Sequence, residues 1–124
     1  MKLSIHRIFQ VFGEGEAESR LWPMLRAAAQ AGRDVEMTPG AQIRDFVPAE
    51  VVAEQLLRAC ERQDIIPGIA LIENVGSGQP RTVREFAEEW WQRWNGQGRL
   101  SFGVKPYRAG EVMRYVPALP PLPS

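Results

Sequence analysis

The sequence predicts an α/β or α+β fold, a small domain in which short strands alternate with about three helices. The first observation is apolar residues at helical spacing in several stretches, the clearest of which runs from Leu21 to Ala29. The second is a series of short β-prone runs that end in glycine-containing turns. The third is size, because 124 residues with 44% hydrophobic residues are enough for one domain with a core.

The amino-terminal elements are a strand and a helix. The apolar run from Ile5 to Phe12 is β-prone and stops at a glycine turn, Gly13-Glu14-Gly15, which predicts a buried strand followed by a loop. A helix follows from Ser19, since Pro23 is tolerated in a first turn and Gly32 can adopt the left-handed conformation after the last.

The middle of the chain predicts short extended segments and a second helix. The extended segments are Val35 to Met37 and Ile43 to Val47, and Pro48 suits the first position of the helix. The buried stripe of this helix is expected to consist of Val52, Leu56, Ala59 and Cys60.

The carboxyl-terminal part predicts a strand, a third helix and a last extended segment. Ile69 to Ile72 form a continuous apolar strand, and Thr82 with Glu85 makes a capping box that opens the helix. A final extended segment runs from Leu100 to Val104. We therefore expect one domain over residues 1–116 and a proline-rich, polyproline-like or mobile tail over residues 117–124.

Composition excludes several classes of partner. Lys plus Arg and Asp plus Glu number 15 each, so no overall charge draws the chain to nucleic acid or to an anionic membrane. Cys60 is the only cysteine, which excludes an internal disulfide and a cysteine-based zinc site. The first residues form neither a signal peptide nor a membrane span, and we expect a cytoplasmic protein.

Two arginine-containing segments are candidates for anion binding. Arg44, beside Asp45 and just before a helix, offers a planar donor fork suited to phosphate or carboxylate. Arg108 with Glu111 adds a second arginine in a glycine-containing loop, and two separated arginines suit a diphosphate. A structural salt bridge between Arg44 and Asp45, and a solvated Arg108, explain the same residues equally well.

Other candidate residues have plainer explanations. The glycine-containing segment Asn74–Gly78 lacks the pattern of a phosphate-binding loop and is expected to be a strand-to-helix turn. His6, the only histidine, is expected to be structural. The tryptophans of the third helix either pack in the core or contribute to an interface. These tryptophans are Trp90, Trp91 and Trp94.

Five motifs occur in an order that matches a known family. They are Arg7–Gly15, the helix with the early Pro23, Arg44–Val47, Asn74–Gly78 with the Thr82 helix, and Arg108–Glu111. The chain thereby resembles the carboxyl-terminal, substrate-binding part of the extended short-chain dehydrogenase/reductases. These form the NAD-dependent epimerase/dehydratase family, which acts on nucleotide-activated sugars through an extended Rossmann-type fold.

The resemblance implies a set of substrate-binding residues. Arg44 and Arg108 would contact the nucleotide diphosphate, and Glu111 would lie near the ribose. Gln10 would occupy the place of an asparagine that faces the substrate. At the start of the first helix, three residues would border the nucleotide: Ser19, Arg20 and Leu21.

The chain also departs from the family pattern. Ala49 and Val51 replace a valine and an aspartate, and neither Tyr107 nor Tyr115 has a lysine four residues later. The glycine-rich dinucleotide turn is absent as well. Hydride transfer needs a nicotinamide held beside a proton donor, and the sequence shows neither device.

The expected function is therefore nucleotide-sugar binding by a domain or fragment that is not catalytic alone. The chain would hold no cofactor, NAD or NADP would act in an intact relative, and the partners would be a nucleotide sugar or nucleotide diphosphate. A homodimer or a missing cofactor domain is the expected protein partner. The alternative is a non-enzymatic module that self-associates through the tryptophan-rich helix. The sequence contains no nucleophile-base pair and no metal-binding cluster that would support a self-sufficient enzyme.

Overall fold

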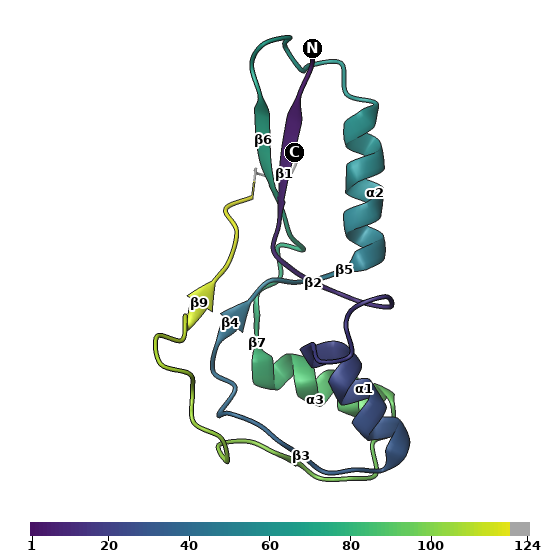
Figure 1. The fold of residues 1–124 in the computed structure, drawn as a ribbon, viewed down its shortest axis with the longest axis vertical. Helices are drawn as coiled ribbons and strands as arrows, with labels where there is room; N and C mark the ends of the chain where they lie inside the picture. The colour runs from purple at the N-terminus through teal and green to yellow at the C-terminus, as the bar shows by residue number, and fades with distance from the viewer. Residues whose placement is uncertain (120–124) are drawn as a thin grey trace. The chain divides into compact units, whose positions relative to one another are not determined.

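The computed structural model describes residues 1–119, which form two compact units (Figure 1). Unit 1 comprises residues 1–12, 45–80 and 116–119, and unit 2 comprises residues 13–44 and 81–115. The composition is mixed α/β with three helices and short strands, as the sequence predicts. Most of the predicted tail, residues 120–124, lies outside the described residues. No helix within residues 1–119 has the length and apolar character needed to cross a membrane.

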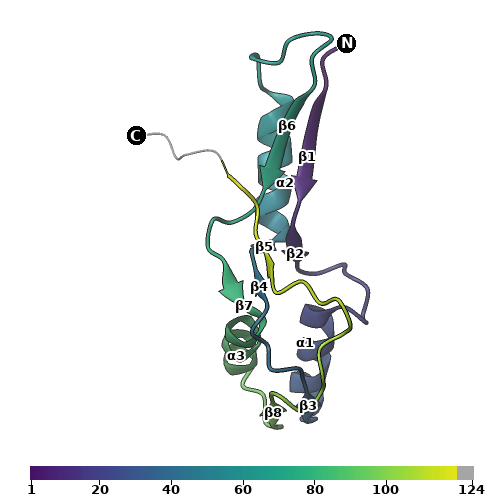
Figure 2. The same cartoon turned by 90° about the vertical axis from the view of Figure 1, so that its left-hand side faces the viewer.

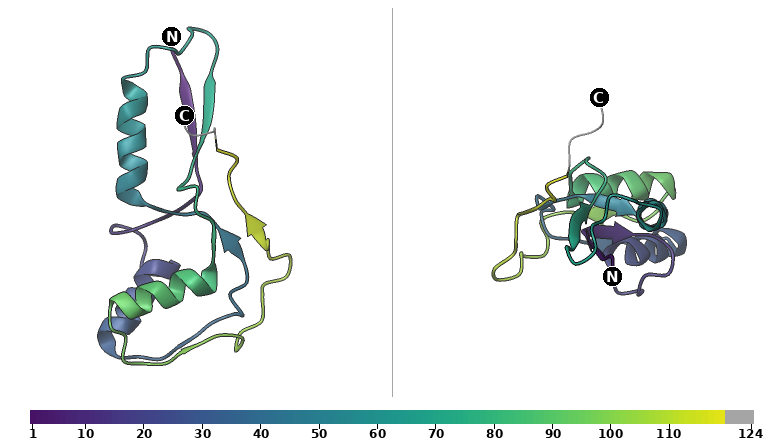
Figure 3. Two further views of the ribbon diagram at one scale, coloured as in Figure 1. Left: turned by 180° about the vertical axis from the view of Figure 1, so that it is seen from behind. Right: turned by 90° about the horizontal axis from the view of Figure 1, so that it is seen from above.

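Unit 1 contains two pairs of parallel strands and one helix. The strands β1 (Ser4–Ile8) and β6 (Leu71–Val75) form one pair, and β2 (Gln10–Phe12) and β5 (Phe46–Pro48) form the other. Helix α2 (Ala49–Cys60) packs against β1, β2 and β5 and runs beside the β1–β6 pair (Figure 3). The core of this unit is small, and its buried members are Val47, Val52 and Val75.

The start of α2 differs by one residue from the prediction. Pro48 ends β5 in an extended conformation, with φ of −61° and ψ of 142°, and acts as the N-cap rather than as the first helical residue. Its missing N–H costs nothing there because a helix leaves its first donors unpaired.

Burial in unit 1 was overestimated from the sequence. Ile5 and Ile8 of the predicted buried strand are exposed, and so is Cys60 of the predicted buried stripe. The strand expected over Ile69 to Ile72 begins at Leu71 and continues to Val75, which leaves Ile69 exposed. Ile5 lies on the face of the β1–β6 pair that α2 does not cover. Ile8 points to the opposite face and is exposed because the single helix covers that face only in part.

Unit 2 is built around two helices, α1 (Leu21–Ala31) and α3 (Val83–Arg93), which pack against each other (Figure 2). Gly32 ends α1 in the left-handed conformation with φ of 69°, as predicted. The predicted capping box of α3 is confirmed, because the Thr82 side chain accepts from the Glu85 amide and the Glu85 side chain accepts from the Thr82 amide.

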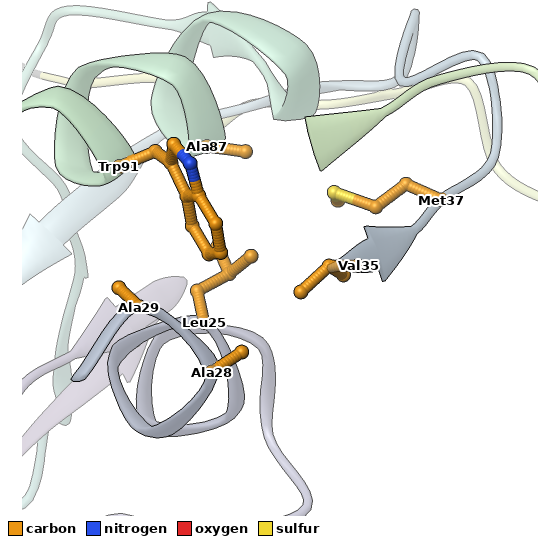
Figure 4. Close-up of a cluster of buried hydrophobic side chains, with 7 residues drawn as sticks. All are labelled: Leu25, Ala28, Ala29, Val35, Met37, Ala87 and Trp91. Carbon is orange, nitrogen blue, oxygen red and sulfur yellow. The ribbon is translucent and has the colours of Figure 1, made fainter. Parts of the chain in front are cut away.

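The core of unit 2 fills the space between these helices and an adjoining strand. Its buried side chains interdigitate from α1, α3 and the segment around β3 (Val35–Glu36), as Figure 4 shows. They are Leu25, Ala28, Ala29, Val35, Met37, Ala87 and Trp91. The other tryptophans pack on one another, with the rings of Trp22 and Trp90 edge-on at a centroid distance of 5.5 Å.

Short strands complete unit 2. β3 pairs in parallel with β8 (Leu100–Ser101), while β4 (Ile43–Arg44) lies between antiparallel β7 (Arg81–Thr82) and parallel β9 (Arg114–Tyr115). The single extended segment predicted over Ile43 to Val47 is therefore two strands, β4 and β5, which belong to different sheets.

Candidate functional site

Arg44, at the end of β4, is held by backbone oxygens. Its Nη1 donates to the Ile43 carbonyl at 2.9 Å and its Nη2 donates to the Val112 carbonyl at 2.7 Å. The same Nη2 lies 3.7 Å from Glu111 Oε1. The side chain is largely buried, so these contacts fix the plane of the guanidinium.

Glu111 links Arg44 to a second residue of the same segment. Gln42 Nε2 donates to Glu111 Oε1 at 3.0 Å, so one carboxylate oxygen serves both side chains. Gln42 is only 7% exposed, and its Oε1 has no hydrogen-bond partner among residues 1–119. Gln42, which lies two residues before Arg44, was not identified as a site residue from the sequence.

Arg108 lies in the loop that carries Glu111. The Glu111 amide donates to the Arg108 carbonyl at 3.1 Å, and Gly110 has φ of 75°, which closes a tight turn. The Tyr107 hydroxyl accepts from the Ala41 amide at 3.0 Å, which ties the other end of the loop to the segment before β4. The two residues are 66 positions apart, so the local sequence pattern could not predict this hydrogen bond.

The two arginines therefore differ. Arg44 is enclosed and fully oriented, whereas Arg108 is exposed and its guanidinium has no partner within the described part of the chain. The structure brings Arg44 into contact with Glu111 and Val112 of the loop that carries Arg108. The loop presents the free donors of Arg108 to solvent.

The residues at the start of α1 are divided between solvent and core. Ser19 and Arg20 are exposed, and Arg20 Nε lies 3.8 Å from Glu16 Oε2. Arg20 is the N-cap but makes no side-chain cap bond. Leu21 is half-buried and packs against the core cluster of unit 2, so most of its surface serves packing.

Gln10 and His6 lie in unit 1. Gln10 is half-buried in β2, where it is the register partner of Phe46 in β5. His6 shares a contact of 3.1 Å with the Ser4 hydroxyl, consistent with the structural role expected for it.

The glycine turn after β6 is occupied by a protein carboxylate. Asp45 is fully buried, and it accepts from the Ser77 amide at 2.7 Å, the Ser77 hydroxyl at 2.6 Å and the Gly78 amide at 2.9 Å. A Cβ on Gly76 would lie 2.6 Å from Asp45 Oδ2, so glycine is required for this close approach. The alternative of a salt bridge between Arg44 and Asp45 finds no support in the contacts that either side chain makes.

Neither glycine turn fits a dinucleotide. A dinucleotide turn needs free backbone amides for the pyrophosphate. The amides of Ser77 and Gly78 are taken by Asp45, and the Gly13 amide donates to Glu16 Oε1 at 2.8 Å. Within residues 1–119 there is also no group of His, Cys, Asp or Glu side chains suited to a metal ion.

Ion pairs support the helix beside the β4 sheet. Arg81 of β7 bonds to Glu89 of α3, and this hydrogen bond lowers the pKa of the Glu89 carboxyl despite its partial desolvation. The hydrogen bond from the Thr82 amide lowers the pKa of the Glu85 carboxyl. Both carboxylates thus favour the charged form that stabilises α3 and its junction with β7.

The chain matches the family model described as "NAD dependent epimerase/dehydratase family" over residues 1–76. No match is found among the curated proteins. The match covers β1, β6 and the Arg44 motif, but it ends before the loop that carries Arg108 and Glu111.

Solved structures share the fold. The UDP-N-acetylglucosamine 4-epimerase from Methanobrevibacter ruminantium M1, in complex with UDP-N-acetylmuramic acid, is 18% identical with a TM-score of 0.80, over 96% of this chain and 38% of that chain. The UDP-glucuronic acid 4-epimerase from Bacillus cereus, in complex with UDP-glucuronic acid and NAD, is 18% identical with a TM-score of 0.77, over 96% and 37%. The dTDP-glucose 4,6-dehydratase from Streptomyces venezuelae, with NAD bound, is 19% identical with a TM-score of 0.70, over 94% and 35%. The chain thus spans little more than a third of the length of each similar structure.

Proposed function

The chain belongs to the NAD-dependent epimerase/dehydratase family, and from this premise we propose that unit 2 carries a nucleotide-sugar-binding surface that performs no redox chemistry alone. The observation that carries the proposal is the contrast between the two arginines. Arg44 is fixed by two carbonyls and Glu111, while the Arg108 guanidinium has no partner among residues 1–119. The surface consists of Arg44, Arg108 and Glu111.

A nucleotide diphosphate suits this arrangement. Its two phosphates carry charge that separated guanidiniums neutralise better than one, and charge-assisted hydrogen bonds are the stronger kind. Arg44 loses little conformational entropy on binding because its side chain is already ordered. Arg108 is available to close on the ligand from an exposed loop.

The neighbouring polar groups suit a sugar hydroxyl. The Glu111 carboxylate and Gln42 Oε1, which has no partner within residues 1–119, are both acceptors, and ribose hydroxyls are donors. A buried acceptor without a partner costs about 1–3 kcal/mol, which a hydroxyl donor would recover. Ser19 and Arg20, which are exposed in unit 2, are further candidates for this surface, and Leu21 contributes less because it packs against the core cluster. Gln10 is a separate candidate in unit 1.

The residues present supply no hydride chemistry. Tyr107 uses its hydroxyl as an acceptor for the Ala41 amide, and neither tyrosine has the lysine that the family's catalytic pair requires. Because the glycine turns do not fit a dinucleotide, NAD or NADP and the acid/base tyrosine would come from a cofactor-binding half outside these residues. The whole reaction would then require both parts.

The alternative function, self-association through the tryptophan-rich helix, has less support. Trp91 is buried, and Trp90 packs between Trp22 and Trp94 at centroid distances of 5.5 and 5.2 Å. Tryptophans that pack on one another leave little apolar surface for a partner. A homodimer stays a prediction.

Calorimetric titration tests the proposal. The purified chain is titrated with UDP-glucose, UDP-glucuronic acid, dTDP-glucose, UDP and, as a control, NAD. We expect saturable binding of a nucleotide sugar and of its nucleotide diphosphate, and no stoichiometric binding of NAD. Tight NAD binding, or no binding of any nucleotide, would contradict the proposal.

Arg108 gives the cleanest variant because its exposed side chain makes no hydrogen bond or ion pair with the described residues 1–119. Arg108→Ala is expected to weaken binding about 10- to 100-fold, since one charge-assisted contact contributes about 1.5–3 kcal/mol. Arg99→Ala, an exposed arginine of the same unit, is the matched control and should leave binding unchanged. If Arg108→Ala and Arg99→Ala weaken binding equally, Arg108 acts only through the overall positive charge and makes no specific contact with the ligand.

A further inference from the structure

The loop that carries Arg108 is exposed at every residue but one. Between β8 and β9, residues 103–106 and 108–110 are exposed, and only Tyr107 is half-buried. Gly103 and Gly110 have φ of 82° and 75°, left-handed values that glycine adopts without strain. We call the segment 103–110 the arginine loop. A loop with so little burial depends on a few specific bonds for its conformation.

The backbone holds the start of the arginine loop. The amides of Val104 and Lys105 both donate to the Met37 carbonyl at 3.1 Å. In Figures 1 and 2, the chain between β8 and β9 runs beside the chain between β3 and β4 in this region. These two bonds precede Arg108 in the sequence and leave the arginine itself to be fixed by later contacts.

Arg108 lies between two side chains that reach back to one segment. Directly before it, the Tyr107 hydroxyl accepts from the Ala41 amide at 3.0 Å. After it, Glu111 Oε1 accepts from Gln42 Nε2 at 3.0 Å. Because Ala41 and Gln42 are consecutive, both attachments join the arginine loop to the same short stretch of backbone.

That stretch, residues 40–42, is bound to the start of α3. The Val83 amide donates to the Gln42 carbonyl at 2.9 Å, and the Arg84 amide donates to the Gly40 carbonyl at 3.0 Å. Both amides belong to the first turn of a helix, where no carbonyl of the helix can accept from them. A Cβ on Gly40 would lie 2.9 Å from Arg84 Cβ, so the stretch lies directly against the helix. The attachment point of Tyr107 is therefore fixed to an element of the core of unit 2.

We propose that Tyr107 is a positioning residue for Arg108. Its hydroxyl holds the arginine loop on the stretch 40–42, so the Arg108 guanidinium is presented to a nucleotide diphosphate from an ordered backbone. The inference rests on the proposed function, which supplies the diphosphate. Ordering a mobile loop on binding lowers the affinity, and a loop that is ordered beforehand avoids this loss. Carbonyl oxygens and Glu111 order Arg44 in the same sense.

The bond of the hydroxyl, rather than packing of the ring, distinguishes Tyr107. Among the described residues, the core cluster of unit 2 and the side chains packed against it include Phe102 but not Tyr107. Tyr107→Phe keeps the ring and removes the hydroxyl, and it should leave the core of unit 2 intact. This variant therefore tests the hydroxyl alone.

The experiment compares Tyr107→Phe with the unsubstituted chain, with and without UDP. In the absence of UDP, hydrogen exchange at the Ala41 amide should accelerate, because the amide loses its acceptor. In calorimetric titration, UDP should bind about 2- to 10-fold more weakly, the range expected for one hydrogen bond between uncharged groups. An Ala41 amide that exchanges equally fast in both chains would overturn the inference.

A double substitution separates positioning from a general loosening of the fold. In an Arg108→Ala background, Tyr107→Phe should have no further effect on UDP binding, since the group that it positions is gone. Thr38→Val is the matched control, because the Thr38 hydroxyl accepts from the Gly40 amide at 3.3 Å and has no printed bond to the arginine loop. Thr38→Val should leave UDP binding unchanged.

The outcomes separate this inference from the proposed function. UDP binding that is indifferent to Tyr107→Phe overturns the inference and leaves nucleotide binding standing. So does an equal loss in the Arg108→Ala background, or an equal loss in Thr38→Val, because Tyr107 then acts on the fold and not through Arg108. If the unsubstituted chain binds no nucleotide, the proposed function fails, and the positioning role fails with it.

Discussion

The two units differ in how completely they bury their own apolar residues. In unit 2, Leu25 and Phe86 are fully buried, and Trp91 packs inside the core cluster. In unit 1, the strand residues Ile5 and Ile72 remain almost half exposed. The core of unit 2 is closed, whereas the strands of unit 1 leave apolar side chains exposed.

This difference indicates how each unit is stabilised. Burying an isoleucine fully is worth about 1.5–3 kcal/mol, so the exposed Ile5 and Ile72 stabilise unit 1 less than fully buried residues would. The contacts of Arg44, Glu111 and Gln42 that support the proposed binding surface lie in unit 2. A binding surface needs a rigid support.

The largest expected effect comes from the core of unit 2. Leu25→Ala should lower the free energy of unfolding by about 3–4 kcal/mol, because the residue is fully buried and its removal leaves a cavity. Tryptophan fluorescence in a urea titration measures the loss, since all four tryptophans lie in unit 2. Ile72→Ala, followed by circular dichroism, should cost less than about 1 kcal/mol. Equal losses of unfolding free energy in Leu25→Ala and Ile72→Ala would contradict the proposed difference in burial between the units.

The second effect concerns the polar support of unit 1. Asp45→Asn keeps the size of the side chain but loses at least one of three accepted hydrogen bonds, and we expect a cost of about 1–3 kcal/mol. Hydrogen exchange at the amides of Ser77 and Gly78 should accelerate. Ser77→Ala removes the hydroxyl that donates to Asp45 and accepts from the exposed Gln79 amide, but it keeps both backbone donors to Asp45 and should cost less. An unchanged exchange rate in Asp45→Asn would show that the small apolar core alone holds this turn.

Local sequence signals predicted the helices well because helix ends depend on neighbours in sequence. The capping box of Thr82 and Glu85 and the left-handed Gly32 both act within a few residues, and both were correct. Burial of β1 was not predictable in the same way. The apolar residues of Ile5–Phe12 indicate a strand, but which face is covered depends on α2 and on the absence of a second layer within the described residues.

The candidate site was predictable only as motifs. Arg44, Arg108 and Glu111 were each singled out by the sequence, but the contact of Arg44 with Glu111 joins segments far apart in the chain. The local sequence pattern predicted neither the hydrogen bond between Tyr107 and Ala41 nor the contact of Gln42 with Glu111. Asp45 was considered as a partner for Arg44, whereas its carboxylate binds a turn 32 residues away.

A smaller effect should appear in the acid stability of unit 2. The Arg81 hydrogen bond lowers the pKa of Glu89 below its ordinary value of 4.5. A carboxyl whose pKa is lowered on folding contributes stability at pH values above its unfolded-state pKa. This stability is lost as the pH falls through the folded-state pKa. Because Glu89 is partly exposed, solvent screens the pair and Glu89→Gln should cost less than about 1 kcal/mol at neutral pH.

The measurement is the melting temperature between pH 7 and pH 3. The difference between the unsubstituted chain and Glu89→Gln should shrink as pH falls below about 4.5. Glu88→Gln, which removes the exposed pair with Arg84 on the same helix, is the control. A difference in melting temperature that grows as the pH falls would contradict a stabilising pair between Arg81 and Glu89.

The smallest effect tests how narrow the core of unit 1 is. Cys60 was predicted on the buried stripe of α2, but the helix buries only Val52 and Ala59, and the thiol is exposed. Cys60→Ser should therefore change stability by less than about 0.5 kcal/mol, and a thiol reagent should label the native chain as fast as the denatured chain. Val52→Ala, which truncates a buried residue of the same helix, should lower the free energy of unfolding by about 1–3 kcal/mol. Slow labelling of native Cys60 would mean that α2 has a wider buried stripe, and that unit 1 is less open than its sheet indicates.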